Sequence, residues 1–153
     1  INCYSSGSIT GNEWVGGLSG NNFIGEITNC YSTVNVSGDK RVGGLIGSNE
    51  LGTITNCYST GHVSGNELAG GLVGENTSFF SFGAISNSFW DIETSGQLIS
   101  TGGMGKRTDE MQTRSTFTNV GWDFVDEIEN GTDDIWWIDE GNNYPGLWWE
   151  LTE

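Results

Sequence analysis

A short motif that recurs at a fixed spacing constrains the fold of this chain more than any other feature. Asn-Cys-Tyr-Ser begins at residues 2, 29 and 56, a spacing of 27, and Asn87-Ser88-Phe89 is a degenerate fourth copy 31 residues later. Gly-Gly-Leu begins at residues 16, 43 and 70 with the same spacing, and a further glycine follows each copy. A fixed period of this length predicts a repeat architecture.

Within one copy, short apolar segments alternate with turn residues. The second copy has apolar segments at 30–36, 42–46 and 52–55, with turns at 37–40 and 47–49. Each segment has the length of a strand and is too short for a helix. We therefore expect about three strands in each copy.

Copies of this length are expected to stack, because 27 residues cannot bury their own apolar face. Stacking at about 4.8 Å pairs each strand with its equivalents above and below. The sequence thus predicts an all-β fold, a parallel β-solenoid (β-helix) of three to four coils. The expected core ladders are Val15, Val42 and Ala69; Leu18, Leu45 and Leu72; and Ile27, Ile54 and Ile85.

Two polar positions of the repeat are expected to be structural. The asparagine at 2, 29, 56 and 87 falls where a corner would lie, since asparagine tolerates left-handed backbone geometry, and stacked amides can hydrogen-bond to one another. Cys3, Cys30 and Cys57 should form a ladder of free thiols. Parallel stacking keeps their Cβ atoms as far apart as their Cα atoms, beyond the distance that a disulfide prefers.

Charge excludes several classes of partner. The chain has 20 acidic residues and five Lys and Arg, a formal net charge of −15, so nucleic acid is not an expected partner. No apolar run approaches the length needed to cross a bilayer, so membrane insertion is not expected either. His62 is the one histidine, and we interpret it as an exposed bystander rather than a catalytic base.

The character of the chain changes near residue 87. Six of the seven tryptophans and 14 of the 20 acidic residues follow this point. We expect solenoid repeats over 1–90 and an irregular, acidic, tryptophan-rich cap over 91–153, with a small hairpin and a short helix near 109–114. Such an end would cover edge strands that otherwise promote aggregation.

Four tryptophans of this segment are candidate ligand-binding residues. Trp136, Trp137, Trp148 and Trp149 could stack on sugar rings, or they could fill the interior of the cap. Alternation along a strand would bury one of each pair and expose the other. The acidic clusters lack the spaced loop of a calcium site, so no metal site is expected, and neither catalytic residues nor a cofactor.

The pattern Gly-Gly-Leu-x-Gly followed by Ile-x-Asn-Cys-Tyr-Ser resembles the GLUG repeat of bacterial and archaeal surface proteins, including some adhesins. Residues 1–86 carry the pattern, and the later stretch through Trp90 and Gly121 to Leu147 looks like the segment that often closes such arrays. The resemblance implies a spacer or presenting surface in a large secreted protein. It implies an extracellular or cell-surface location and no enzymatic activity.

Two functional hypotheses follow. The first is a structural or adhesive surface protein, the end of a long adhesin or a subunit of a filament. The chain opens inside a repeat, so we expect a piece of a longer protein whose first coil continues the solenoid or pairs with another chain. The alternative is a carbohydrate-binding module that uses the C-terminal tryptophans.

Overall fold

The computed structural model describes residues 1–77 and 82–152. The chain divides into two compact units: apart from Ile1 and Asn2, the first is Cys3–Lys106 and the second is Arg107–Glu153. The strand β15 (Met104–Lys106) pairs with β14 (Phe89–Asp91). The first unit therefore extends past residue 90, where the composition changes.

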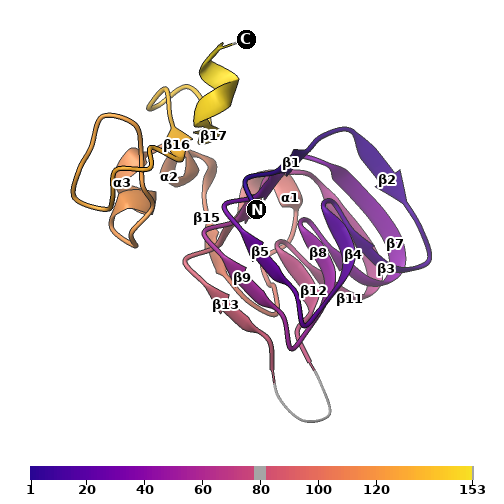
Figure 1. Ribbon diagram of the computed structural model, residues 1–153. Coiled ribbons are helices and arrows are strands. Elements are labelled where there is room, and N and C mark those ends of the chain that lie inside the picture. The colour runs from indigo at the N-terminus through magenta and orange to yellow at the C-terminus, as the bar shows by residue number, and fades with distance from the viewer. Residues whose placement is uncertain (78–81, 153) are drawn as a thin grey trace. The chain divides into compact units, whose positions relative to one another are not determined.

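The first unit is a parallel β-solenoid in which four sheets run along the array (Figure 1). One sheet contains β1 (Tyr4–Ser5), β6 (Tyr31–Ser32), β10 (Tyr58–Ser59), β14 and β15. The next contains β2 (Ser8–Thr10), β3 (Glu13–Gly16), β7 (Asn35–Gly43) and β11 (Val63–Gly70). The third contains β4 (Ser19–Phe23), β8 (Ile46–Glu50) and β12 (Val73–Glu75), and the fourth β5 (Glu26–Thr28), β9 (Thr53–Thr55) and β13 (Ala84–Ser86).

The expected solenoid is confirmed, and its register follows the sequence period. Tyr4 pairs with Tyr31 and Tyr31 with Tyr58, so equivalent residues lie over one another. The longer fourth step is absorbed between β12 and β13, because Ile54 still pairs with Ile85. The number of strands per copy differs from the expected three. The segment 30–36 breaks at Thr33–Val34, so a two-residue strand at Tyr31–Ser32 precedes β7.

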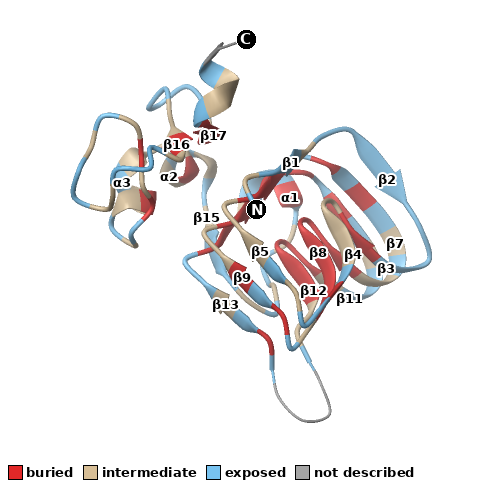
Figure 2. Cartoon of the chain, viewed as in Figure 1, coloured by how far each residue is buried: buried red, intermediate tan, exposed pale blue. Residues whose placement is uncertain are grey.

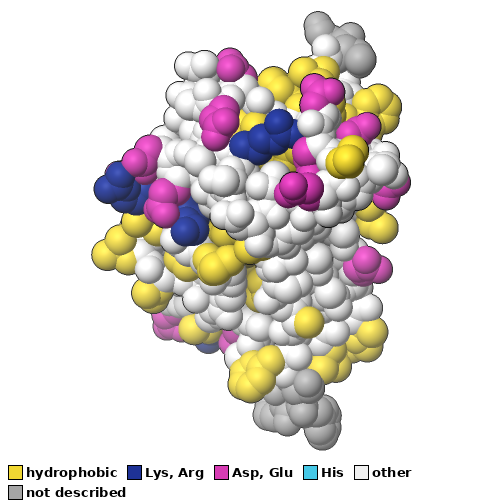
Figure 3. All heavy atoms as spheres, turned by 90° about the vertical axis from the view of Figure 1, so that its left-hand side faces the viewer, with side chains coloured by type: hydrophobic (Ala, Val, Ile, Leu, Met, Phe, Trp, Pro, Cys, Tyr) yellow, Lys and Arg dark blue, Asp and Glu magenta, His cyan; other side chains and the backbone are white. Residues whose placement is uncertain are grey.

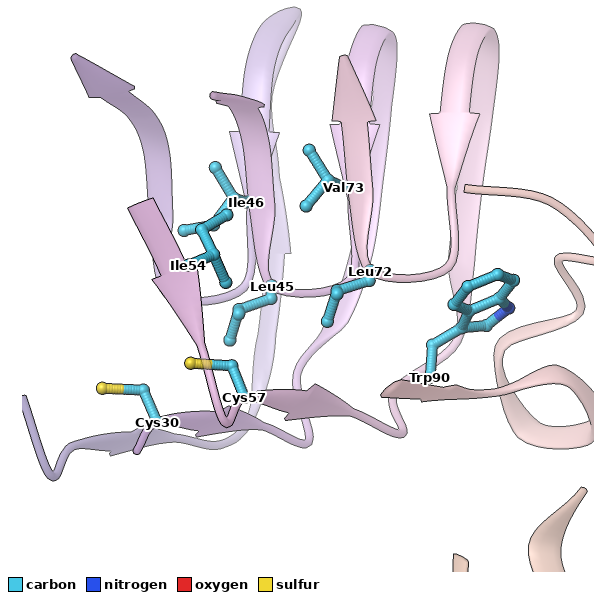
Figure 4. Packing of buried hydrophobic residues seen from close by; sticks show 8 residues of the cluster. All are labelled: Cys30, Leu45, Ile46, Ile54, Cys57, Leu72, Val73 and Trp90. Atoms are coloured by element: carbon cyan, nitrogen blue, oxygen red, sulfur yellow. The ribbon is translucent and has the colours of Figure 1, made fainter. Parts of the chain in front are cut away.

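The core of the solenoid consists of two columns of apolar side chains. Valines form the smaller column, at Val15, Val34, Val36, Val42 and Val63. The larger column contains Cys30, Leu45, Ile46, Ile54, Cys57, Leu72, Val73 and Trp90 (Figure 4). Both contain members of the ladders expected from the sequence, and buried residues recur on successive coils (Figure 2).

The repeated asparagine has the expected left-handed backbone. Asn2, Asn29 and Asn56 have φ of 53°, 53° and 52°, and Asn87 has 47°. The stacked amides lie in a different column: Asn22 donates to Asn49, which donates to Asn76. The side-chain oxygens of Asn2 and Asn56, by contrast, are buried without a hydrogen-bond partner.

The Gly-Gly pair of the repeat is required by close backbone approach. A Cβ atom on Gly43 would lie 1.9 Å from the carbonyl oxygen of Ile46, within the same turn. A Cβ atom on Gly44 would lie 2.2 Å from the carbonyl oxygen of Gly71, on the next coil. The first glycine thus permits the turn, and the second permits the stacking of coils.

Residues 90–106 end the array within the first unit. Trp90 takes the register position of Ser59, and its indole N–H donates to the carbonyl oxygen of Gln97 at 2.9 Å. The short helix α1 (Ile92–Ser95) follows, with the Asp91 side chain as its N-cap. Ser100 then accepts hydrogen bonds from the N–H groups of Leu72 and Val73. This part of the chain therefore covers the last coil.

The second unit is a small aromatic-cored fold. It contains α2 (Thr108–Met111), α3 (Arg114–Thr118), the antiparallel hairpin of β16 (Trp136–Trp137) and β17 (Gly146–Leu147), and the 3-10 helix η1 (Trp148–Thr152). The hairpin and the short helix expected from the sequence are therefore present. Its fully buried apolar side chains are Met111, Phe117, Trp122, Phe124, Trp136 and Leu147.

Candidate functional site

The four candidate tryptophans fall into different environments. Trp136 is fully buried in the second unit and lies 4.4 Å from Trp122, measured between ring centroids. Trp137 and Trp149 are half-buried, and the indole nitrogen of Trp137 is buried without a hydrogen-bond partner. Trp148 is the most accessible of the four, with 48% of its surface exposed.

Local backbone structure explains this distribution. Trp136 and Trp137 are neighbours on β16, so their side chains point to opposite faces of the hairpin, as alternation predicts. Trp148 and Trp149 begin η1 instead of continuing the strand. The rule of alternation therefore does not apply to the second pair, and the sequence could not indicate which of them is exposed.

Trp148 lies beside a hollow of about 430 Å³. The other lining residues are Val125, Asp133, Asp134 and Leu151, all from the second unit. Apolar side chains provide most of the lining, and the two ionisable residues are both acidic. The hollow thus combines an accessible indole with two carboxylates, a set of groups suited to a ligand with a flat apolar face and hydrogen-bond donors.

Backbone hydrogen bonds hold the walls of this hollow in place. The N–H of Val125 donates to the carbonyl oxygen of Trp136 at 2.7 Å, and the N–H of Trp148 donates to that of Ile135 at 3.0 Å. The carboxylate of Asp123 accepts from the N–H of Asp133 at 2.8 Å. The loop that carries the lining carboxylates is therefore tied to the hairpin.

The solenoid surface carries charged side chains in register. Lys40 lies 3.5 Å from Glu67 on the next coil. Arg41 pairs with Glu75 and lies over the exposed ring of Trp14, 5.7 Å from its centroid. Exposed pairs of this kind contribute about 0–1 kcal/mol each, so we interpret them as support for the register. On the face shown in Figure 3, acidic side chains are more frequent than basic ones.

The thiols and the histidine form no reactive centre. Cys3, Cys30 and Cys57 are free, as expected, and the last two are buried. Each donates a hydrogen bond to the carbonyl oxygen two residues earlier. Burial raises the pKa of the Cys57 thiol, and His62 is exposed. Among residues 1–77 and 82–152, no group of three or more His, Cys, Asp or Glu side chains could hold a metal ion.

Comparisons with known proteins identify the repeat. The model of the GLUG motif matches residues 11–37 and 38–64. A putative Gly-rich membrane protein of Evansella cellulosilytica is 41% identical over 75 residues, which are 48% of this chain. The chain spans only 8% of the length of that relative.

Two further findings complete the comparison. No solved structure matches the chain. Within the described ranges, no helix is both long and apolar enough to cross a membrane. Residues 11–64 thus form successive 27-residue periods of the solenoid. The chain therefore carries two consecutive GLUG motifs, stacked as parts of one β-solenoid.

Proposed function

We propose that this chain is a non-catalytic structural or adhesive protein of the cell surface, in which the solenoid serves as a rigid rod. The carrying observation is the register of the coils, in which residues 27 apart pair along the sheets. A structure of this kind lengthens by adding coils, because each coil contacts only its neighbours. Length and stiffness are the properties that a spacer or a presenting surface needs.

The first coil supports growth in one direction. Ile9 pairs with Val36, which pairs with Val63, yet Ile9 is 42% exposed while both valines are buried. Within the described residues, β2, β4 and β5 each pair with one neighbouring strand. Their outer edges suit another coil of the same kind. That coil would come from an earlier repeat of the same polypeptide or from a second copy of the chain.

An extracellular position is part of this proposal. The relative from Evansella cellulosilytica is described as a membrane protein, and it is many times longer than the matched region. We extend a surface location from that protein to this one. A glycine-rich array of polar-faced coils is suited to carrying a terminal segment away from a cell surface.

Negative-stain microscopy of the isolated chain tests self-assembly. We expect rods or fibres whose length increases with protein concentration. Ile9→Lys should shorten them, because a charge at the end of the valine column opposes stacking. Leu98→Lys is the matched control, since Leu98 is exposed and follows the last full coil. A uniformly monomeric, compact particle at all concentrations would remove self-assembly.

A second candidate function is carbohydrate binding by the second unit. The observation that favours it is the half-exposed Trp148 in a hollow that also contains two carboxylates. Flat aromatic faces stack on sugar rings, and carboxylates accept hydrogen bonds from sugar hydroxyls. A glycan array probed with the parent chain and with Trp148→Ala tests this function. Binding that is absent from the parent, or unchanged in the variant, would exclude Trp148 as the platform.

A further inference from the structure

We propose that the hollow beside Trp148 selects a positively charged sugar, an unacetylated hexosamine such as glucosamine within an oligosaccharide. The pyranose ring would stack on the indole, and the carboxylates of Asp133 and Asp134 would bind the ammonium group. This inference depends on the carbohydrate-binding function proposed above and names the class of sugar.

The charge of the second unit supports a cationic ligand. Between Arg107 and Glu153 the sequence has 12 acidic residues and two arginines. Arg107 pairs with Asp109 at 2.5 Å, and Arg114 donates to the carbonyl oxygen of Val125 and lies 5.4 Å from the ring centroid of Phe124. Neither guanidinium lines the hollow. The two lining carboxylates are thus left without a cation of their own.

Hydrogen bonding separates these carboxylates from other acids of the same unit. Asp123 accepts from Asp133, Glu127 from three N–H groups, and Glu150 from Leu147. Those three side chains hold the local fold together. Across the described part of the chain, the carboxylates of Asp133 and Asp134 have neither a hydrogen bond nor an ion pair. They are therefore available to a ligand.

The lining of the hollow supports a sugar amine over a small hydrated cation. Val125, Leu151 and Trp148 provide a largely apolar wall, which suits the faces of a pyranose ring. An ammonium group over the face of a tryptophan is attracted by about 0.5–2 kcal/mol, depending on how far it is desolvated. The indole and the carboxylates therefore favour the same protonated sugar.

Isothermal titration with three tetrasaccharides tests the inference: one of glucosamine, one of N-acetylglucosamine and one of glucose. At pH 6 the aspartates are ionised and the amines are protonated. We expect the glucosamine tetrasaccharide to bind at least about 10-fold more tightly than either neutral one, a difference of about 1.4 kcal/mol. Its affinity should fall as sodium chloride rises from 50 to about 500 mM, because salt screens exposed charges.

Three variants of the full chain identify the site. Trp148→Ala should abolish binding of all three sugars, and thermal unfolding should confirm that the exposed indole is not needed for folding. The double variant Asp133→Asn and Asp134→Asn should remove the preference for glucosamine and leave any weak binding of the neutral sugars. Asp139→Asn is the matched control, because it removes an exposed charge of the same unit outside the hollow.

Each contrary result has a distinct meaning. Equal affinity for the three tetrasaccharides, with loss in Trp148→Ala, would keep carbohydrate binding and overturn the charge selection. Glucosamine binding that survives both sets of variants would show general attraction to an acidic protein and overturn the site. If none of the sugars binds, the inference and the carbohydrate-binding function both fail, whereas the proposed rod is unaffected.

Discussion

Asn22 donates a hydrogen bond of 2.8 Å from its side-chain amide to the side-chain oxygen of Asn49, which lies 27 residues later and one coil along the solenoid. Asn49 repeats the contact with Asn76 at 3.0 Å. Each amide also donates to a backbone oxygen of its own coil, that of Gly25, Gly52 or Gly83. One column of side chains therefore ties the coils to each other and closes the turn within each coil.

Asn49→Leu tests the importance of this column. The substitution removes two donated hydrogen bonds and the acceptor used by Asn22, and it leaves buried polar groups unsatisfied. We expect a loss of about 2–4 kcal/mol in the free energy of unfolding, measured with urea. Asn66→Ala is the control, because Asn66 also bonds a residue 27 away but on the exposed surface. Equal effects of the two variants would contradict the role of burial.

The sequence period predicted the register of the coils, but it could not identify this amide column. Asparagine recurs at several positions of the repeat, and only the direction of its side chain decides whether amides stack inside or face solvent. The motif asparagines were expected to stack, whereas the structure uses them for their backbone conformation. The left-handed residues Trp14, Arg41 and Leu68 also escaped prediction, because their side chains carry no preference for positive φ.

The candidate site was predicted only in part. Composition located the tryptophans in the terminal segment, and the exposure of Trp148 depends on β17 ending at Leu147 and a 3-10 helix beginning there. The hollow also requires Val125 and Asp133, which come from a loop with no sequence motif. Contacts of this kind depend on tertiary packing and have no local signal.

Asn56 provides a test of conformation separate from hydrogen bonding. Its φ is 52° and its side-chain oxygen has no hydrogen-bond partner. Asn56→Gly should therefore change the free energy of unfolding by less than about 0.5 kcal/mol, since glycine adopts this conformation readily. Asn56→Val should cost about 1–2 kcal/mol, because a β-branched residue is strained there. If urea unfolding ranked the two variants in the opposite order, the side-chain amide would be the important feature.

Gly44→Ala tests the close approach of successive coils. The new Cβ atom would lie 2.2 Å from the carbonyl oxygen of Gly71 and 2.9 Å from the side-chain oxygen of Ser59. Because both atoms belong to packed neighbours, we expect a loss of about 3 kcal/mol and a lower thermal midpoint by circular dichroism. Ser37→Ala, at an exposed position of the same coil, should leave the midpoint unchanged. A tolerated alanine at 44 would mean that the coils can move apart.

The thiol ladder predicts how the three cysteines react. Cys3 is exposed, whereas Cys30 and Cys57 lie in the solenoid core. The thiolate is the reactive form, so the raised pKa of Cys57 slows its alkylation further. Iodoacetamide should therefore modify one cysteine in the native protein and three after denaturation, as counted by mass spectrometry. Fast native labelling of Cys30 or Cys57 would contradict the core arrangement.

Duplication of residues 38–64 tests whether the solenoid grows by whole repeats. The inserted segment is one matched GLUG motif, and its ends meet the chain at equivalent positions because Ser37 pairs with Ser64. One coil should be added, about 4.8 Å along the axis, and the thermal midpoint should rise because another interface between coils is formed. The extra copy of Cys57 should also be buried, so native alkylation should still modify a single thiol.

A scrambled insert of the same composition is the matched control for this duplication. Its residues cannot continue the ladders of Leu45 with Leu72 and Val42 with Ala69, so the strands on either side of it would lose their register. We expect the scrambled protein to have a lower thermal midpoint and a second thiol that reacts in the native state. If the true duplication behaved in the same way, the coils would not be interchangeable units, and a rod that lengthens by repeats would be an untenable function for this chain.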